Sequence, residues 1–346
     1  MIGVLSDLHL KEKLAYADYI KDGRKAEKEE ILDFIVESFE DCNIIVFVGD
    51  QLDRRNNPSE VVREFVELVE RFKDKQIVII AGNHEKTGNG KSAMDFLKEI
   101  DGKNNWHIVT NNLYKLINSK KSLELHFLPY FTNSELGVKS SDEAKEKVLD
   151  MLTGGNILFV HHSISEILIN ENHTTDSLSE VVLPRELLEE RYKLVVGGHI
   201  HKAQKNNRTI ISGSIFNNEV GETQKYIWKI DEKDCSTKKI KLPGRGIYKL
   251  ENPSIEDLDA IHKGNIVKVV LTDEKKKKDV NALKDALKRF DAYLFLEQYP
   301  RKRKKMHFEE GMLEFDVEKL LETYAKERKI DVVELKKAWA LIKHYD

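Results

Sequence analysis

Cysteine is scarce in this sequence, with two among 346 residues, Cys42 and Cys235. Neither lies within a cluster of closely spaced histidines or acidic residues, so the sequence does not predict a zinc site built on thiolates. Two isolated cysteines are also too few for the disulfide framework that stabilises small secreted domains. We therefore expect one small buried cysteine and one surface cysteine, in a reducing environment.

An excess of charge of one sign and long hydrophobic runs are also lacking. Lysine and arginine number 57 against 60 aspartates and glutamates, giving a net charge of −3. A basic surface for a polyanionic partner would therefore have to be local. No stretch approaches the roughly 20 apolar residues of a membrane helix, and the chain opens on an apolar β-branched run instead of a basic, leader-like segment. We expect a cytoplasmic protein with no membrane segment.

Short polar motifs are abundant, and five of them follow apolar, β-branched runs at residues 2–5, 44–48, 77–81, 157–160 and 194–196. Such runs predict fully buried strands, which in α/β proteins are usually parallel. Polar residues beyond the carboxyl ends of neighbouring strands converge in one crevice. The motifs are, in order, Asp7-Leu8-His9, Gly49-Asp50, Gly82-Asn83-His84-Glu85, His161 and Gly198-His199-Ile200-His201.

The five motifs together offer seven oxygen and nitrogen ligands and no thiol. This number is enough for two divalent cations that share the carboxylate of Asp50, an arrangement suited to phosphate ester cleavage. Imidazole and carboxylate ligands without sulfur suit Mn²⁺, with Fe²⁺ or Zn²⁺ also compatible. One isolated His-x-His would be weak evidence, but five motifs at successive strand ends are specific. The expected ligands are Asp7, His9, Asp50, Asn83, His161, His199 and His201.

Three further residues are candidates for roles beside the cations. His84, next to Asn83, is the expected general acid. Asp53 and Arg54 follow Asp50 closely enough to orient His84 or reach the substrate, although a surface ion pair is an equal alternative. His162 could exchange roles with His161, which we prefer as the ligand because it directly follows the buried run.

The order of predicted elements indicates an α/β fold in three parts. Residues 1–245 alternate strands with helices at 28–40 and 59–72, the second with Ser59 as N-cap. Pro243-Gly244-Arg245-Gly246 marks a boundary, followed by a strand–helix–strand unit within residues 246–310. Residues 311–346 contain two charged amphipathic helices.

The five motifs resemble those of the calcineurin-like metallophosphoesterase superfamily, over roughly the first 200 residues. This resemblance implies a four-layer sandwich of two mixed sheets flanked by helices. Ser212-Gly213-Ser214, Glu222 and Lys225-Tyr226, together with the later strand–helix–strand unit, resemble the SbcD family. That family provides the nuclease subunit of a complex for DNA double-strand-break repair.

The SbcD resemblance implies a Mn²⁺-dependent DNA exonuclease and endonuclease, with a small α+β domain that caps the DNA and C-terminal helices that dock onto the coiled coil of an SbcC-like ABC-type ATPase. It also implies a homodimer. Phosphate contacts are expected from a run of basic residues after the last strand. These residues are Arg301, Lys302, Arg303, Lys304 and Lys305. The expected anchors for the ATPase are Leu320, Leu321, Tyr324, Leu335, Trp339 and Ile342.

Two alternatives remain open at this point. A stand-alone phosphomonoesterase or cyclic phosphodiesterase of the same superfamily would use the same ligands, and Gly-Asp-Gln-Leu-Asp-Arg at 49–54 also resembles phosphatases. Asp53 stands where some SbcD relatives have histidine, which indicates a different subfamily. A binding scaffold with a vestigial site is disfavoured, because every ligand position is present.

Overall fold

The computed structural model describes residues 1–20, 23–87, 91–118 except 101–104, 122–169, 173–177, 180–290, 292–299, 317–328 and 331–342. These residues fall into two compact units, Met1–Tyr299 and Pro300–Asp346. None of the helices in the described ranges is long and apolar enough to cross a membrane.

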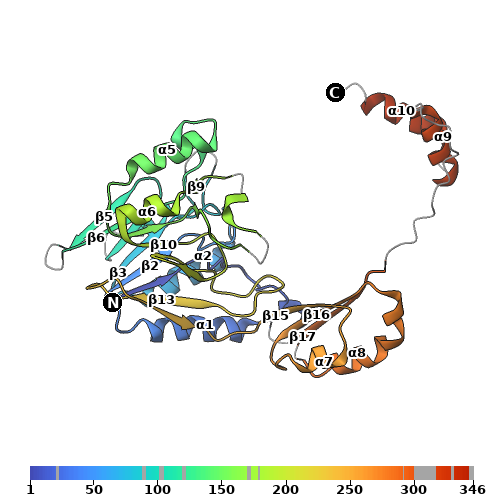
Figure 1. Ribbon diagram of the computed structural model, residues 1–346, viewed down its shortest axis with the longest axis horizontal. Coiled ribbons are helices and arrows are strands. Elements are labelled where there is room, and N and C mark those ends of the chain that lie inside the picture. Colours follow the sequence, from blue (N-terminus) through green and yellow to red (C-terminus); the bar gives the residue numbers. More distant parts are fainter. Residues whose placement is uncertain are drawn as a thin grey trace. The chain divides into compact units, whose positions relative to one another are not determined.

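The first unit contains two six-stranded sheets (Figure 1). The first sheet has the order β14-β13-β1-β2-β3-β4, with β1 to β4 parallel, β13 antiparallel to β1 and β14 antiparallel to β13. Its strands are β1 (Ile2–Leu5), β2 (Ile44–Val48), β3 (Gln76–Ile80), β4 (Trp106–Val109), β13 (Tyr226–Ile230) and β14 (Thr237–Lys241).

The second sheet has the order β11-β12-β10-β7-β6-β5, with β12, β10, β7 and β6 parallel and the outer two strands antiparallel. Its strands are β5 (Tyr114–Asn118), β6 (Leu123–Leu128), β7 (Gly155–Val160), β10 (Tyr192–Gly197), β11 (Gln204–Asn206) and β12 (Thr209–Ile211). A short pair, β8 (Ser163–Ile164) and β9 (Val182–Leu183), lies outside both sheets.

Three hydrophobic cores hold four layers together, because alternate side chains of a strand point to opposite faces. Val4 of β1 lies in the core between the sheets, whereas the adjacent Leu5 lies in the core beneath the helices. The first sheet is covered by α1 (Lys25–Ser38) and α2 (Ser59–Glu70), and the second by α5 (Ser141–Met151) and α6 (Arg185–Arg191). The predicted sandwich of two mixed sheets flanked by helices is therefore confirmed.

Smaller features refine the sequence expectations. Ser59 is not the N-cap of α2: Pro58 occupies that position, and the Ser59 hydroxyl bonds to Glu60 instead.

The two cysteines agree with the expectation of one buried and one more accessible residue. Both are free, and Cys42 is buried while Cys235 is half-buried. Burial raises the pKa of the Cys42 thiol to about 11, so Cys42 behaves as a small hydrophobic side chain.

The described residues before β13 also form four short helices. They are η1 (Ala17–Tyr19), α3 (Leu97–Ile100), α4 (Asn133–Leu136) and η4 (Thr175–Ser177).

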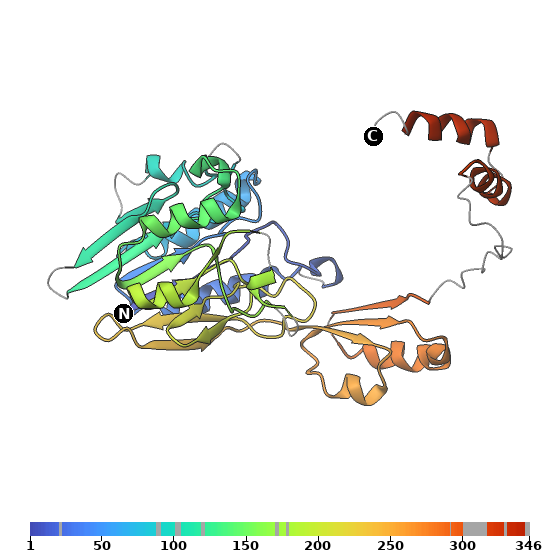
Figure 2. The same ribbon diagram turned by 45° about the horizontal axis from the view of Figure 1, so that its top comes forward.

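After the connection at 242–246, a parallel three-stranded sheet forms, of β15 (Ile247–Glu251), β16 (Ile266–Leu271) and β17 (Ala292–Glu297). The helical segments α7 (Ile255–Asp259), η5 (Glu274–Asp279) and α8 (Val280–Leu287) complete this unit, and Figure 2 shows α7 and α8, in orange, on one face of the sheet. Strand β15 and helix α7 were absent from the sequence prediction. The opposite side packs on Tyr16, Ile20 and Val220.

The second compact unit contains α9 (Val317–Arg328) and α10 (Val332–Ile342), which pack against each other. Ala325 is fully buried, and Lys336 pairs with Glu322 at 2.8 Å. Of the expected anchor residues, Tyr324 is exposed while Leu321 and Leu335 are half-buried. The side chains of Leu320, Trp339 and Ile342 lie outside the described part of the chain.

Candidate metal centre

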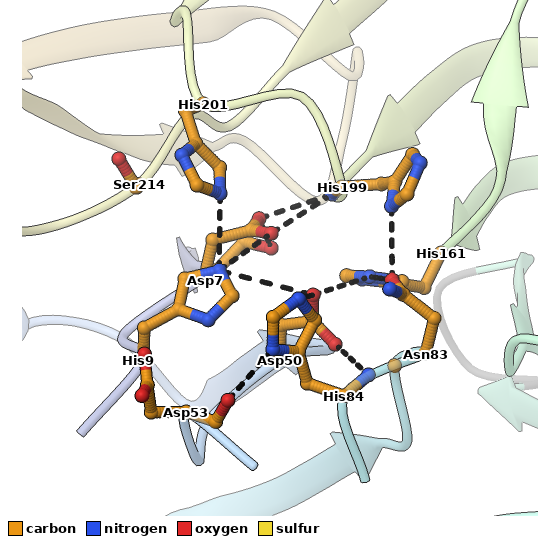
Figure 3. Close-up of polar contacts among 12 residues, drawn as sticks. Asp7, His9, Asp50, Asp53, Asn83, His84, His161, His199, His201 and Ser214 are labelled. Carbon is orange, nitrogen blue, oxygen red and sulfur yellow. Dashed lines mark hydrogen bonds and ion pairs between the residues drawn. The ribbon is translucent and has the colours of Figure 1, made fainter. Parts of the chain in front are cut away.

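The five polar motifs meet between the two sheets, at the carboxyl ends of their parallel strands (Figure 3). β1, β2 and β3 bring Asp7, Asp50 and Asn83 from the first sheet, and β7 and β10 bring His161 and His199 from the second. Three groups of these side chains have ligand atoms within 4.8 Å of one another: Asp7, His9 and His201; His9, Asp50 and His84; and Asp50, His161 and His199.

The main chain turns sharply at the strand ends. Asp7, His9, Asp50 and His199 all have positive φ, between 43° and 74°, a region that residues with a Cβ seldom occupy. This local strain bends the chain directly beyond the strands, where Asp7 and His9 reach one group of ligand atoms. Strained backbone of this kind is characteristic of functional sites.

Gly49 is required by close packing of the two sheets. Its φ is 88°, and a Cβ at this position would lie 1.9 Å from Nδ1 of His161. A larger residue would therefore displace His161. In the Gly-Asp motif, Gly49 lets the main chain approach the His161 ring closely, and Asp50 then supplies a carboxylate next to it.

A first group of ligand atoms surrounds His9 and His201. Their Nε2 atoms are 3.0 Å apart, and Nε2 of His9 is 3.8 Å from Oδ1 of Asp7. At this distance one nitrogen can donate an N–H to the other, or both can direct a lone pair to one cation. Asp7 is fully buried and accepts the main-chain N–H of His199.

A second group surrounds Oδ1 of Asn83, which is 3.3 Å from Nε2 of His161 and 3.0 Å from Nδ1 of His199. Asp50 lies between the two groups, with Oδ2 3.4 Å from Nε2 of His161 and 3.8 Å from Nε2 of His9. Its other oxygen accepts the main-chain N–H of His84. One carboxylate can therefore contribute to two cation sites.

Hydrogen bonds on the outer side fix which histidine nitrogens face the centre. Nδ1 of His161 donates to the Val48 carbonyl at 2.6 Å, which leaves its Nε2 with a lone pair toward Asn83. Nε2 of His199 donates to the Glu180 carboxylate at 2.8 Å, which leaves its Nδ1 facing Oδ1 of Asn83. Metal-binding histidines usually have such an acceptor on the second nitrogen. The oxygen and nitrogen donors thus fit divalent cations.

The pKa values of the clustered side chains also fit a cation site. Burial lowers the pKa of His9 to about 4, against the opposing effects of Asp7 and Asp50, so its ring is neutral at physiological pH. Burial also disfavours charge on His161, but the Asp50 carboxylate outweighs it and raises the pKa of His161 to about 10. His161 in turn holds the pKa of Asp50 well below its usual range, despite burial. Positive charge is stabilised at the position where a cation would bind.

His84 lies at the open side of this cluster, with 41% of its side chain exposed. Its Nδ1 donates to the main-chain carbonyl of Asp53 at 2.8 Å, and its Nε2 is 4.0 Å from Oδ2 of Asp50. The contact from residue 53 thus comes from the main chain, whereas the Asp53 carboxylate lies 3.4 Å from the Lys11 ammonium. Sequence reasoning placed Asp53 beside His84 but could not distinguish its carbonyl from its carboxylate.

Several other sequence candidates lie outside the cluster. Nε2 of His162 accepts the main-chain N–H of Phe131, and its ring stacks on Tyr130, so it lies behind the site. The Arg54 side chain is 67% exposed and 4.0 Å from the Asp53 carboxylate. Residues 301–305 lie outside the described ranges.

Two glutamates that support the site had no assigned role in the sequence. Glu85 is fully buried and accepts the main-chain N–H groups of Gly82, Asp50 and Leu52, which ties the second and third motif loops together. Its place in the Gly-Asn-His-Glu motif was a usable signal. Glu180, which orients His199, is far from every motif in sequence and gave no signal.

Replacing Glu180 with glutamine should lower cation affinity by roughly tenfold to a hundredfold, the usual effect of losing such an outer partner. The reason is that His199 would lose the carboxylate that fixes its tautomer. Calorimetric titration with Mn²⁺ measures the change, with Glu186→Gln on α6 as the matched control. Unchanged affinity in Glu180→Gln would show that His199 is held without it.

Comparison with known proteins agrees with this geometry. Residues 1–203 match the family model described as calcineurin-like phosphoesterase. The chain is also similar to a solved structure of an archaeal phosphodiesterase, at 14% identity and a TM-score of 0.34, over 70% of this chain and 99% of that one. The search of curated proteins gave no match. Because the family model covers more than half of the sequence, including all five ligand motifs, the chain belongs to the calcineurin-like phosphoesterase family.

Proposed function

We propose that this chain is a DNA exonuclease and endonuclease of the SbcD type, dependent on Mn²⁺ and working with an SbcC-like ABC-type coiled-coil ATPase. The observation that carries the proposal is the part of the chain beyond the matched phosphoesterase region. Residues 247–299 add a three-stranded sheet with its own helices, and α9 and α10 belong to a separate compact unit. A phosphatase for small molecules requires neither addition.

Two cations would be held by the residues already described. One site would use Asp7, His9, Asp50 and His201, and the other Asp50, Asn83, His161 and His199. When bound, paired divalent cations stabilise the attacking and leaving oxygens of a phosphodiester displacement. Mn²⁺ suits this donor set, and Fe²⁺ or Zn²⁺ is compatible with it.

His84 would supply the proton for the leaving oxygen. Its Nδ1 donates to the Asp53 carbonyl, so Nε2 is the nitrogen that remains to face a substrate. This nitrogen is on the exposed side of the cluster, where a phosphodiester can approach. A protonated Nε2 can stabilise charge on a phosphate oxygen and then release its proton to the leaving group.

The remaining parts of the chain would hold the substrate and the partner. In this proposal residues 246–310 cap the DNA, Arg54 and the basic residues 301–305 contact phosphates, and α9 and α10 dock on the ATPase. The protein would act as a homodimer. Tyr324 is exposed on α9, as a docking residue should be.

The direct test is digestion of end-labelled linear duplex DNA by the purified chain with Mn²⁺, alone and with an SbcC-like ATPase from the same source. We expect Mn²⁺-dependent cleavage, changed by ATP when the partner is present. Hydrolysis of an aryl phosphate or a cyclic nucleotide, without cleavage of DNA, would instead support the small-molecule phosphoesterase of the same family.

Truncation after residue 311 should leave Mn²⁺-dependent DNA cleavage and thermal stability nearly unchanged, because α9 and α10 form a unit apart from Met1–Tyr299. It should abolish co-purification with the ATPase and any ATP stimulation. Full binding of the ATPase by the truncated chain would overturn the docking assignment.

A further inference from the structure

Lys225 is a buried cation close to the metal centre that the mechanism above does not use. It precedes β13 and is 4% exposed. A lysine ammonium is costly to bury, so its partners must be well placed. Its ammonium contacts the Glu222 carboxylate, the Ser214 hydroxyl and, at 3.4 Å, the main-chain carbonyl of His201.

The segment that Lys225 holds contacts two expected ligands of the first cation site. The N–H of Ser214 donates to the His201 carbonyl at 3.1 Å, and the N–H of Ile215 lies 3.4 Å from the Asp7 carbonyl. Figure 3 shows Ser214 beside the loop that carries His201.

Glu222 secures the other end of this arrangement. Its second oxygen accepts the N–H groups of Asn218 at 2.6 Å and Glu219 at 2.9 Å. Lys225 and Glu222 therefore close residues 214–225 into one loop against His201. None of the contacts described for Lys225 reaches Asn83, His161 or His199.

We propose that Lys225 is a positioning residue for the first cation site, where it holds the main chain of His201 and the loop that adjoins Asp7. The site that contains Asn83, His161 and His199 does not depend on it. This inference rests on the metal centre and not on the proposed DNA substrate, so a titration with metal tests it separately.

Two possible roles of Lys225, as a repelling charge or as a positioning residue, predict opposite changes in cation affinity when its ammonium is removed. If the ammonium acted only through its charge, its removal would eliminate a repulsion and tighten cation binding. If it positions His201, its removal would weaken binding at the first site, by roughly tenfold to a hundredfold as for other outer partners of metal ligands. The sign of the change therefore decides between the two roles.

The experiment is a calorimetric titration of the full chain with Mn²⁺, after chelation and dialysis. The variants are Lys225→Met, Lys225→Arg, His201→Ala and the double variant Lys225→Met/His201→Ala. Lys28→Met is the matched control, because Lys28 is also buried and paired, at 2.7 Å from Glu64. Thermal unfolding of each variant without Mn²⁺ shows whether it is folded.

We expect Lys225→Met to weaken one of two sites and leave the other within about threefold, which Lys28→Met should not do. Lys225→Arg should recover most of the affinity, and the double variant should bind like His201→Ala, because both changes act on one site. Unchanged or tighter binding in Lys225→Met would overturn the proposal. Equal weakening of both sites, or a further loss in the double variant, would also overturn it.

Discussion

Replacing Asp50 with alanine is expected to abolish phosphoester hydrolysis and to lower cation occupancy at both sites. Oδ2 of Asp50 lies within 4 Å of His161 and His9, which belong to different groups of the centre. No other described carboxylate lies between the two groups. Its loss removes a charged ligand from both groups and the carboxylate nearest to His161.

The measurement for Asp50→Ala is the metal content by mass spectrometry together with the rate on a phosphodiester substrate in excess Mn²⁺. Asp41→Ala is the matched control, since Asp41 is an acidic residue that pairs with Lys229 at the surface. Full activity of the metal-replete Asp50→Ala protein would contradict a two-cation centre. Loss of one cation with the other retained at normal affinity would show that Asp50 is not shared.

Replacing His84 with alanine should lower the rate by roughly a hundredfold or more while both cations remain bound, the usual scale for loss of a general acid. His84 is exposed and held by the Asp53 carbonyl, whereas the ligand histidines are buried or nearly so. Single-turnover rates and metal content, measured on the same sample, distinguish a general acid from a metal ligand. Loss of metal in His84→Ala would make it a ligand.

Asp53→Ala gives a sharp contrast to His84→Ala. The carbonyl that accepts from His84 remains in this variant, and the pairs of the carboxylate with Lys11 and Arg54 are lost. A surface pair of this kind contributes about 0–1 kcal/mol. The rate should therefore stay within about threefold. A hundredfold loss would restore the Asp53 carboxylate to the catalytic role that its sequence position suggested.

The sequence was informative where local patterns determine the structure. β-Branched runs predicted β1, β2, β3, β7 and β10, and the rule that parallel strands end at a common edge placed their polar residues together. The second helix does begin at Ser59, but its N-cap is Pro58 and not Ser59, since capping signals locate boundaries only to within a residue or two.

Contacts between loops could not be predicted from the sequence. Glu180 and His199 are 19 residues apart, and no periodic pattern connects them. Lys225 and Glu222 carried no local sign that they close a loop against His201, because a buried lysine has the same sequence neighbourhood as an exposed one. Such pairs depend on the packed arrangement of loops, which hydrophobic periodicity does not specify.

Crystals soaked in Mn²⁺ and measured at the manganese absorption edge test the central claim most directly. The account predicts two anomalous peaks on either side of the Asp50 carboxylate. One should lie among Asp7, His9 and His201, and the other among Asn83, His161 and His199. A single peak, or a pair of peaks that do not both contact Asp50, would contradict it.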